Sequence, residues 1–578
     1  MVRGLDLPPD EPLPAIVRAY LPHRARQHHS DGIEASEWSL VFDCETTSDT
    51  VHSLRFGAFQ VYWRDFLQDA GLFYDPARTS EHDLAVLRGA AAERGFDVLE
   101  LDEFVDQVLL RYVYDLTGIC VGFNLPFDIS RIARGHVVSA SRDGFSFDLS
   151  ETRRKIRVRI RQRNGRSRIQ FVTRGSRHPS DHAGHFTDIS MLGRALTGTH
   201  HSLKTLAKTL GTEHQKIKDS HGELLDSEYV GYCINDVQVT WECFQALKER
   251  YESYKLSQTP ITRVVSEASI GKAALREMGI APFREVQPDF PAPMLGKIMS
   301  TYSGGRSEVR LRRQLAEVIY CDFLSMYTTC CANLGLWRYV IADGMDFRDA
   351  TEETQSFLEQ VTLSDLQDPA TWKRLAVIVE IAPQYDRLPL RADYSAQAGG
   401  DRAAGPQPAP GIANCYVSST EETLTYTLLD CIAAKLDTGR APDVIRATAF
   451  TPRAPQLGLT PIDVAGNPDY RVDPYTDDYY RKLIELRNDV KERAKAARAA
   501  GDETLARRLD AEQQGLKITA SSTSYGALIE LNVEALAEPK ITDAYGQQGP
   551  FFTQVDRVER PGRYFHPLPA TLIPGPPG

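Results

Sequence analysis

The amino-acid sequence predicts a large α/β protein made of several domains. At 578 residues, the chain is several times longer than a typical domain of roughly 100–200 residues. From about residue 39, short alternating apolar segments typical of strands are interspersed with apolar stripes at helical spacing. A highly charged stretch with helical character follows at 476–514. We therefore expect a mixed α/β fold in which a helical region lies late in the chain.

The composition argues against several classes of protein. No apolar run approaches the ~18 residues needed to cross a bilayer, so no membrane partner is expected. The N-terminus, MVRGLDLPPDEPLP, lacks the basic stretch and apolar core of a signal peptide, so we expect a cytoplasmic protein. The nine cysteines form no CxxC pair, so neither a zinc knuckle nor a disulfide framework is indicated. The net charge of −11 does not exclude a nucleic-acid partner, because such binding depends on local patches.

Shifts in composition suggest the domain boundaries. Residues 1–38, rich in Pro, Arg and His, are expected to form an N-terminal arm. A compact α/β domain, a connector, a second α/β region, a helical region and a Pro-rich and Gly-rich tail follow. The compact domain is expected at 39–255, the connector at 256–300 and the second α/β region at 301–470. The helical region is expected at 471–535 and the tail at 536–578.

The first candidate site residues lie at the end of a predicted strand. In SLVFDCETT, Asp43 and Glu45 are two positions apart, and alternate residues of a strand face the same side. The segment SLRFGAFQVYW is expected to be the antiparallel neighbour. Acidic residues at strand ends are also common in turns, so this pair alone is weak evidence for a site.

A second carboxylate lies at a predicted helix start. ICVGFNLPFDISRIA runs from an apolar strand into Asn124, expected to be the cap, and Pro126, expected in the first turn. Asp128 then lies in the first helical turn, where the helix dipole favours a carboxylate even without a function.

A predicted helix supplies the third element. In DSEYVGYCINDVQVTWECFQALKERY, Tyr232 and Asp236 are four residues apart and share a face. An exposed surface pair would have the same spacing. Four converging carboxylates, however, repel one another unless cations neutralise them, and hard oxygen ligands suit Mg²⁺ or Mn²⁺. Two such ions activate a water and stabilise the leaving oxygen of a phosphodiester.

FDCET, GFNLPFD and YCIND resemble the three motifs of the DEDD exonuclease superfamily, tyrosine subclass. The resemblance implies a ribonuclease H-like domain with metal-dependent 3′→5′ exonuclease activity on a single-stranded DNA end. It implies that Tyr232 positions the attacking water, that Asn124 contacts DNA, and that the metal ligands are Asp43, Glu45, Asp128 and Asp236. The histidine subclass would have His at 231, where this chain has Gly231. Asp188, between the second and third motifs, is expected to be structural.

A basic hairpin is predicted at 153–174, where ten basic residues occur with no acidic one. Apolar residues at 156, 158 and 160 alternate with Arg157, Arg159 and Arg161, and Asn164-Gly165 is a strong hairpin turn signal. One face is expected to pack and the other to contact the phosphate backbone of DNA. A solvated strand face is the alternative.

The second half of the chain resembles the polymerase domain of family B DNA polymerases. TYSGGRSEV resembles their YxGG motif, which implies that Tyr302, Gly304 and Gly305 help to hold the template. VIYCDFLSMYTT, expected to begin as an apolar strand, resembles motif A. This implies that Asp322 binds the catalytic metals and that Tyr327 lies under the incoming sugar, although Thr328 replaces the usual Pro.

The later helices resemble the fingers of the same family. LIELRNDVK places Arg487 and Lys491 four apart on one helix face, where both could bind the triphosphate of a nucleotide. LKITASSTSYG resembles motif B, which implies that Lys517 and Tyr525 also bind the nucleotide. Ser521 stands where Asn is usual, and Tyr525 comes one residue late. Exposed helix cations are the alternative interpretation.

The resemblance implies an exonuclease domain followed by a partial α+β palm at 301–470, fingers at 471–535 and a truncated palm segment at 536–578. No DTD motif follows Gly526, and Asp556 is a poor substitute for its second Asp. We therefore expect a DNA polymerase-like enzyme with an active exonuclease and an incomplete polymerase site. Its partners would be primer-template DNA, deoxynucleoside triphosphates and a separate chain supplying the remaining palm and thumb. The alternatives are a stand-alone exonuclease whose second half only binds DNA, and a catalytically dead nucleic-acid-binding scaffold.

Overall fold

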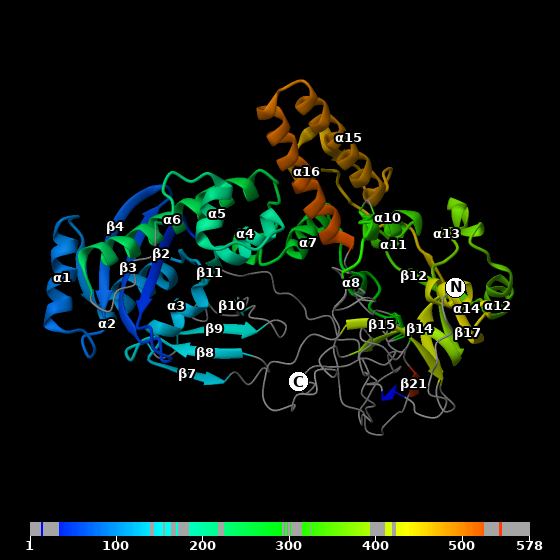
Figure 1. The fold of residues 1–578 in the computed structure, drawn as a ribbon, viewed down its shortest axis with the longest axis horizontal. Helices are drawn as coiled ribbons and strands as arrows, with labels where there is room; N and C mark the ends of the chain where they lie inside the picture. The colour runs from blue at the N-terminus through cyan, green and yellow to red at the C-terminus, as the bar shows by residue number, and fades with distance from the viewer. Residues whose placement is uncertain are drawn as a thin grey trace.

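The structure is a computed structural model that shows a mixed α/β protein with several sheets (Figure 1). It describes residues 13–14, 34–138, 144–153, 156–162, 169–171, 184–217, 225–291, 294, 297–298, 301, 315–323, 325–392, 411–418, 423–524 and 543–545. None of the described helices combines the length and apolar character that crossing a membrane requires.

A six-stranded sheet forms the centre of the N-terminal domain. In spatial order its strands are β11 (His185–Asp188), β6 (Ile119–Gly122), β2 (Trp38–Thr46), β3 (Leu54–Trp63), β4 (Phe66–Tyr74) and β5 (Asp97–Glu100). β3 runs antiparallel to both β2 and β4, whereas β2, β6 and β11 are parallel. The strand expected at SLVFDCETT and its antiparallel neighbour are both confirmed.

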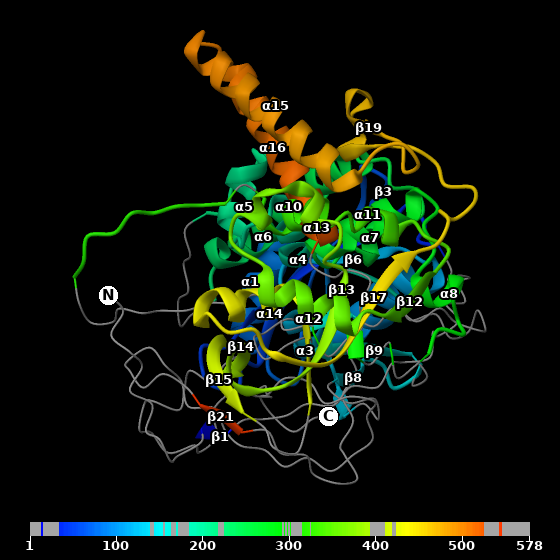
Figure 2. The same ribbon diagram turned by 90° about the vertical axis from the view of Figure 1, so that its right-hand side faces the viewer.

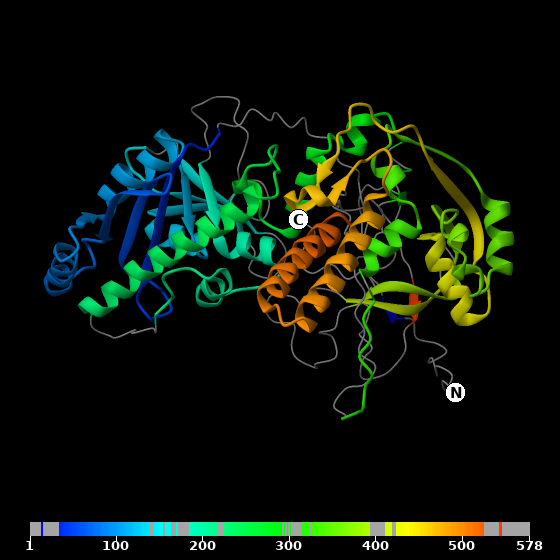
Figure 3. The same cartoon turned by 90° about the horizontal axis from the view of Figure 1, so that it is seen from above.

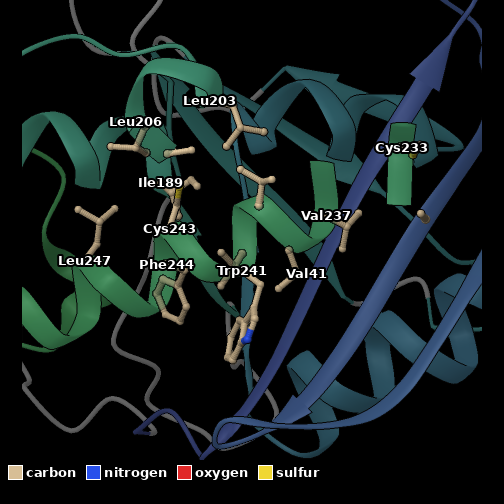
Figure 4. Close-up of a cluster of buried hydrophobic side chains, with 14 of the residues drawn as sticks. Val41, Ile189, Leu203, Leu206, Cys233, Val237, Trp241, Cys243, Phe244 and Leu247 are labelled. Carbon is tan, nitrogen blue, oxygen red and sulfur yellow. The ribbon is translucent and has the colours of Figure 1, made fainter. Parts of the chain in front are cut away.

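Helices cover both faces of this sheet. One face is covered by α1 (Glu81–Ala92), α4 (Ile189–Thr197), α5 (Leu203–Leu210) and α6 (Ser227–Glu252). The other face of the sheet packs against η1 (Phe104–Asp115) and α3 (Leu125–Ile132). Alternation along β2 explains the two cores, because Val41 packs on the α6 side and Phe42 on the η1 side. Figure 4 shows the first core, with Val237 and Trp241 of α6 near Val41.

A smaller antiparallel sheet extends this domain. Its order is β10 (Ile169–Phe171), β9 (Arg157–Gln162), β8 (Gly144–Asp148) and β7 (Gly135–Val138). The pairing of β9 with β10 confirms the predicted hairpin, whose Asn-Gly turn lies outside the described residues.

The segment predicted as a connector contains a packed helix, α7 (Glu267–Glu277). A Cβ added to Gly271 would lie 2.8 Å from the Ser522 carbonyl carbon, so α7 crosses α16 (Glu503–Ser524) at very close range. The side-chain amide of Gln514 on α16 also donates to the Thr197 carbonyl of α4 at 3.0 Å. The N-terminal domain and the late helices are therefore joined by packing as well as by the chain.

The second α/β region contains another antiparallel sheet. Its order is β12 (Met345–Asp349), β17 (Asp443–Pro452), β13 (Val377–Ala382) and β16 (Leu424–Thr427), and its core includes α12 (Thr351–Gln360) and α14 (Leu428–Thr438). A further sheet has the order β1 (Leu13–Pro14), β21 (Asp543–Tyr545), β15 (Gly411–Ser418) and β14 (Gln384–Ala392). The Gly-rich and Pro-rich loop expected between β14 and β15 lies largely outside the described residues.

The predicted helical region is a hairpin of two long helices, α15 (Tyr479–Ala499) and α16, which projects from the body (Figure 2). Figure 3 shows the two helices, in orange, lying side by side. Asp478 caps α15 by accepting from the Arg481 amide at 3.1 Å. The shorter elements are α2 (Leu101–Glu103), η3 (Ile261–Arg263), α8 (Phe283–Val286), α10 (Met326–Asn333), α11 (Trp337–Val340), η4 (Asp365–Gln367), α13 (Pro369–Trp372), β18 (Ile462–Asp463), η6 (Val464–Gly466), η7 (Pro468–Tyr470) and β19 (Arg471–Val472).

One predicted strand is wrong within the described residues. Residues 315–323 are exposed and form no strand, and Ile319 and Tyr320 are 91% and 89% exposed. A strand requires a hydrogen-bonding neighbour, and none of the described strands pairs with this segment. An apolar sequence alone could not supply that neighbour.

Candidate functional site

Strand β2 directs two carboxylates toward α6. Val41, Asp43 and Glu45 alternate along the strand, and Val41 packs in the core beneath α6. Glu45 is buried, and its Oε2 accepts from the hydroxyl of Tyr229 at 2.6 Å. The first two predicted site residues therefore share one face, and a tyrosine of α6 holds one of them.

Asp128 reaches the same place from α3. The Cys44 amide of β2 donates to Asp128 Oδ1 at 3.1 Å, and the Asp128 side chain is buried. Its position in the first turn of α3 agrees with the sequence prediction, and Pro126 lies at the start of that helix as expected.

Helix α6 presents three residues to β2. Tyr229, Cys233 and Asp236 are spaced by four and three positions and therefore lie on one face. All three are buried, and Tyr232 is 4% exposed beside them. The sulfhydryl of Cys233 donates to the Asp43 carbonyl at 3.8 Å.

The four predicted carboxylates interact electrostatically around Asp43. Burial, followed by the charges of Glu45 and Asp236, raises the pKa of Asp43 well above its ordinary value. Burial, followed by the charge of Asp43, does the same to the pKa of Asp128. The structure thus places the four carboxylates within electrostatic reach of Asp43, and oxygens of Asp43 and Glu45 lie within 4.8 Å of each other. Nearby positive charge would stabilise their ionised forms.

A lysine that the sequence analysis missed contacts this cluster. Lys216 pairs with Asp236 and lies 4.8 Å from the centre of the Tyr232 ring. Burial opposes its charged form, but the hydrogen bond to Asp236 raises the pKa of Lys216. Lys216 also lowers the pKa of Asp43 and therefore offsets part of the repulsion.

Two neighbouring residues attach the Lys216 segment to α6. The backbone amide and Nδ1 of His214 contact the Glu242 carboxylate at 2.8 and 2.5 Å. The side-chain amide of Asn235 donates to the Gln215 carbonyl at 3.1 Å. Three consecutive positions, 214 to 216, are thus held on the helix that carries Asp236.

The raised pKa values predict an unusual pH dependence of stability. A carboxyl whose pKa is raised by folding stabilises the fold below its unfolded pKa, and this contribution disappears as pH rises through the folded pKa. In EDTA, Asp128→Asn should therefore raise the free energy of unfolding near neutral pH by on the order of 1–3 kcal/mol, the scale of an uncompensated buried polar group. Urea unfolding at several pH values measures this.

The exposed Glu249 of α6 provides the control, since Glu249→Gln should leave stability unchanged. A destabilised Asp128→Asn protein near neutral pH would show that the Asp128 charge is already compensated.

Asp188 caps the N-terminus of α4. Its Oδ1 accepts from the Ser190 amide and hydroxyl at 2.9 and 2.7 Å and from the Asn124 amide at 3.1 Å. Asn124 precedes α3 in a left-handed conformation with a φ of 62° and no capping hydrogen bond from its side chain among the described residues. Asn124 therefore occupies the N-cap position as expected, but its exposed side chain makes no capping hydrogen bond to α3.

The basic hairpin shows the expected alternation. Val158 and Ile160 are buried, whereas Arg157 and Arg159 are exposed. Arg157 already pairs with Asp148 at 2.7 Å, so this arginine does not require an external anion to balance its charge. The Arg161 side chain lies outside the described residues.

Arg159→Ser tests whether this face contacts DNA. Loss of one single-strand phosphate contact should flatten the slope of log affinity against log salt by about 0.7. Arg157→Ser is the matched control and should change the slope less, because Asp148 already pairs with Arg157. Equal slopes for wild type and Arg159→Ser would identify the face as solvated.

The polymerase-like residues are only partly assembled among the described residues. Asp322 is exposed and lies near enough to Arg487 to influence the pKa of Arg487, which burial lowers. Arg487 also contacts the hydroxyl of Ser325. No group of metal ligands includes Asp322 in the part of the chain that the structure describes.

Three other predicted residues of the second half lie on three different helices. Tyr327 is 37% exposed in α10, and Lys491 and Lys517 are exposed on α15 and α16. Thr328, the residue in place of Pro, contacts the Ala520 carbonyl of α16 at 3.4 Å. Several predicted residues lie outside the described ranges, namely Tyr302, Gly304, Gly305, Tyr525 and Asp556.

Neither the protein-family models nor the curated proteins contain a match to this chain. Among solved structures, the chain is similar to phi29 DNA polymerase complexed with single-stranded DNA, with 11% identity and a TM-score of 0.36. The similarity covers 91% of this chain and 73% of that chain.

Proposed function

We propose that this chain is a metal-dependent 3′→5′ DNA exonuclease joined to an incomplete, family B-like polymerase region. The convergence of Asp43, Glu45, Asp128 and Asp236 carries the proposal. A mixed sheet in which β2 lies between the parallel β6 and the antiparallel β3 supports a ribonuclease H-like domain. The carboxylates of β2, α3 and α6 come together near the carboxyl end of β2, an inner strand of this sheet.

The donor set fits hard divalent cations. Carboxylate oxygens are preferred ligands of Mg²⁺ and Mn²⁺. Burial, followed by the charges of neighbouring carboxylates, raises the pKa values of Asp43 and Asp128, and a bound cation would favour their ionised forms. When bound, two such ions supply an activated water and stabilise the leaving 3′ oxygen. The ligands would be the four carboxylates.

The protein's own groups hold this arrangement. Tyr229 fixes the Glu45 carboxylate, and the Cys44 amide fixes that of Asp128. Lys216 orients Asp236 and restrains the ring of Tyr232, which we assign to positioning the attacking water. Such preorganisation places charges before the substrate arrives.

The test uses two single-stranded DNA substrates, one labelled at the 5′ end and one at the 3′ end. With Mg²⁺ or Mn²⁺, the 5′-labelled strand should shorten one nucleotide at a time, and the 3′ label should be released at once as a mononucleotide. EDTA should stop both reactions. Internal cleavage, release from the 5′ end, or activity that persists in EDTA would contradict the proposal.

The polymerase region is expected to bind primer-template DNA without extending it. Asp322 supplies one carboxylate, whereas two-metal nucleotidyl transfer needs ligands on both sides of the site. Primer extension should therefore be undetectable with an Asp43→Asn variant, which removes degradation. Adding a polypeptide with a DTD hairpin and thumb should restore it. Robust extension by the chain alone would refute the incomplete site and make Asp556 the next residue to change.

A further inference from the structure

A thiol lies among the carboxylates of the proposed exonuclease site. The sulfur of Cys233 and one carboxylate oxygen each from Asp43 and Glu45 all lie within 4.8 Å of one another. Cys233 is fully buried and Glu45 is 6% exposed, whereas Asp43 is partly open. The sulfur and the Glu45 carboxylate are therefore shielded from solvent, whereas the Asp43 side chain remains partly accessible.

The helix fixes the direction of this thiol. Cys233 lies between Tyr229, which holds Glu45, and Asp236, which pairs with Lys216, on one face of α6. Its contact with the Asp43 carbonyl keeps the sulfur against β2. Because residues on both sides of Cys233 are held by contacts to the cluster, this face of α6 stays against β2 and keeps the thiol near the carboxylates.

Sulfur changes which cations such a cluster favours. Thiolate ligands favour Zn²⁺ and other thiophilic ions, whereas Mg²⁺ favours oxygen ligands. A tetrahedral zinc ion with Zn–S of about 2.3 Å and Zn–O of about 2.1 Å requires ligand atoms roughly 3.3–3.8 Å apart. The three donor atoms already lie within 4.8 Å of one another, so a modest side-chain movement would bring them to that spacing.

We propose that Cys233, Asp43 and Glu45 form a three-ligand site for a thiophilic divalent cation such as Zn²⁺, which competes with Mg²⁺ for the same carboxylates. On binding, the Cys233 thiol releases its proton to solvent, the sulfur–metal bond forms, and the ion loses water. This inference rests on the proposed function and adds regulation: zinc should inhibit the exonuclease by occupying its carboxylates.

The chain contains a second cluster of possible metal ligands, and the experiment must distinguish cation binding there from binding at Cys233. Glu213, His214 and Glu242 also place ligand atoms within 4.8 Å of one another, but they include no sulfur. Binding there would produce no metal–thiolate absorption. A sulfur-specific signal therefore distinguishes the two locations.

The probe is Cd²⁺, whose bond to a thiolate gives an ultraviolet charge-transfer band. The full chain is titrated in a Cys321→Ser, Cys330→Ser background, because Cys321 is exposed and the partly exposed Cys330 beside Cys331 would also bind Cd²⁺ through sulfur. The band should appear at about one equivalent, disappear in Cys233→Ser, and persist in Cys243→Ser, which changes a buried cysteine of the same helix. Asp43→Asn should keep the band but weaken Cd²⁺ affinity at least about tenfold.

Inhibition provides the second readout. The Zn²⁺ concentration that halves Mg²⁺-supported degradation should be at least about tenfold higher for Cys233→Ser than for Cys243→Ser. A cadmium band that survives Cys233→Ser, or zinc sensitivity equal in the two variants, would overturn the inference. If the inference alone fails, the wild type still degrades DNA with Mg²⁺. If the proposed function fails, no such degradation occurs, whatever the cadmium spectrum shows.

Discussion

Replacing Asp43 or Asp236 with Asn should lower the rate of 3′→5′ degradation by about a thousandfold or more. Each side chain contributes a carboxylate to the cluster, and Asn retains the shape while removing the charge that holds a cation. A loss of about 4 kcal/mol of transition-state stabilisation corresponds to roughly this factor. Single-turnover degradation of 5′-labelled DNA with saturating Mg²⁺ measures the chemical step.

The control is Glu249→Gln, because Glu249 is an exposed carboxylate on the same helix as Asp236. It should retain the wild-type rate. Degradation by Asp43→Asn or Asp236→Asn at more than about a tenth of the wild-type rate, a difference of only ~1.4 kcal/mol, would show that the cluster is not the nuclease site.

Replacing Lys216 with Met should slow degradation by about a hundredfold. Lys216 pairs with Asp236, contacts Tyr232 and partly offsets the repulsion at Asp43. Removing one preorganised charged group from a water-poor site typically costs a factor of 10² to 10³. The rate constant of single-turnover degradation and the thermal midpoint should both be measured, so that a folding defect is recognised.

Two further variants separate the charge of Lys216 from its placement. Lys208→Met, on the exposed face of α5, is the matched control and should behave as wild type. Glu242→Gln removes the carboxylate charge from the contact with His214 and should give a smaller loss, because the contacts of Asn235 and Asp236 still hold the segment. A Lys216→Met rate equal to that of Lys208→Met would contradict the role assigned to Lys216.

The sequence was sufficient to predict the site residues whose placement depends on regular secondary structure. Strand alternation placed Asp43 and Glu45 on one face, and helical spacing placed Tyr232 and Asp236 together, because both patterns depend only on local backbone geometry. Lys216 could not be found in this way. It lies 20 positions before Asp236, outside any helix or strand, and reaches the cluster only through tertiary contacts.

Longer-range features limited the other predictions. Tyr229 is one helical turn before Cys233, yet nothing in the sequence indicated that its hydroxyl would meet Glu45 across the core. The apolar run before Asp322 predicted a strand, but strand formation depends on a neighbour that the run itself cannot specify. Arg157 was grouped with the other arginines because its partner, Asp148, belongs to the adjacent strand.

Asp43, Glu45, Asp128 and Asp236 together should bind the divalent cations of the proposed exonuclease. The most direct test is a Mn²⁺ titration of the DNA-free protein, followed by the electron paramagnetic resonance signal of free Mn²⁺. We expect the wild type to bind about two more ions than a variant in which all four carboxylates are replaced by the corresponding amides. Equal Mn²⁺ binding by the two proteins, each shown to be folded, would contradict the claim.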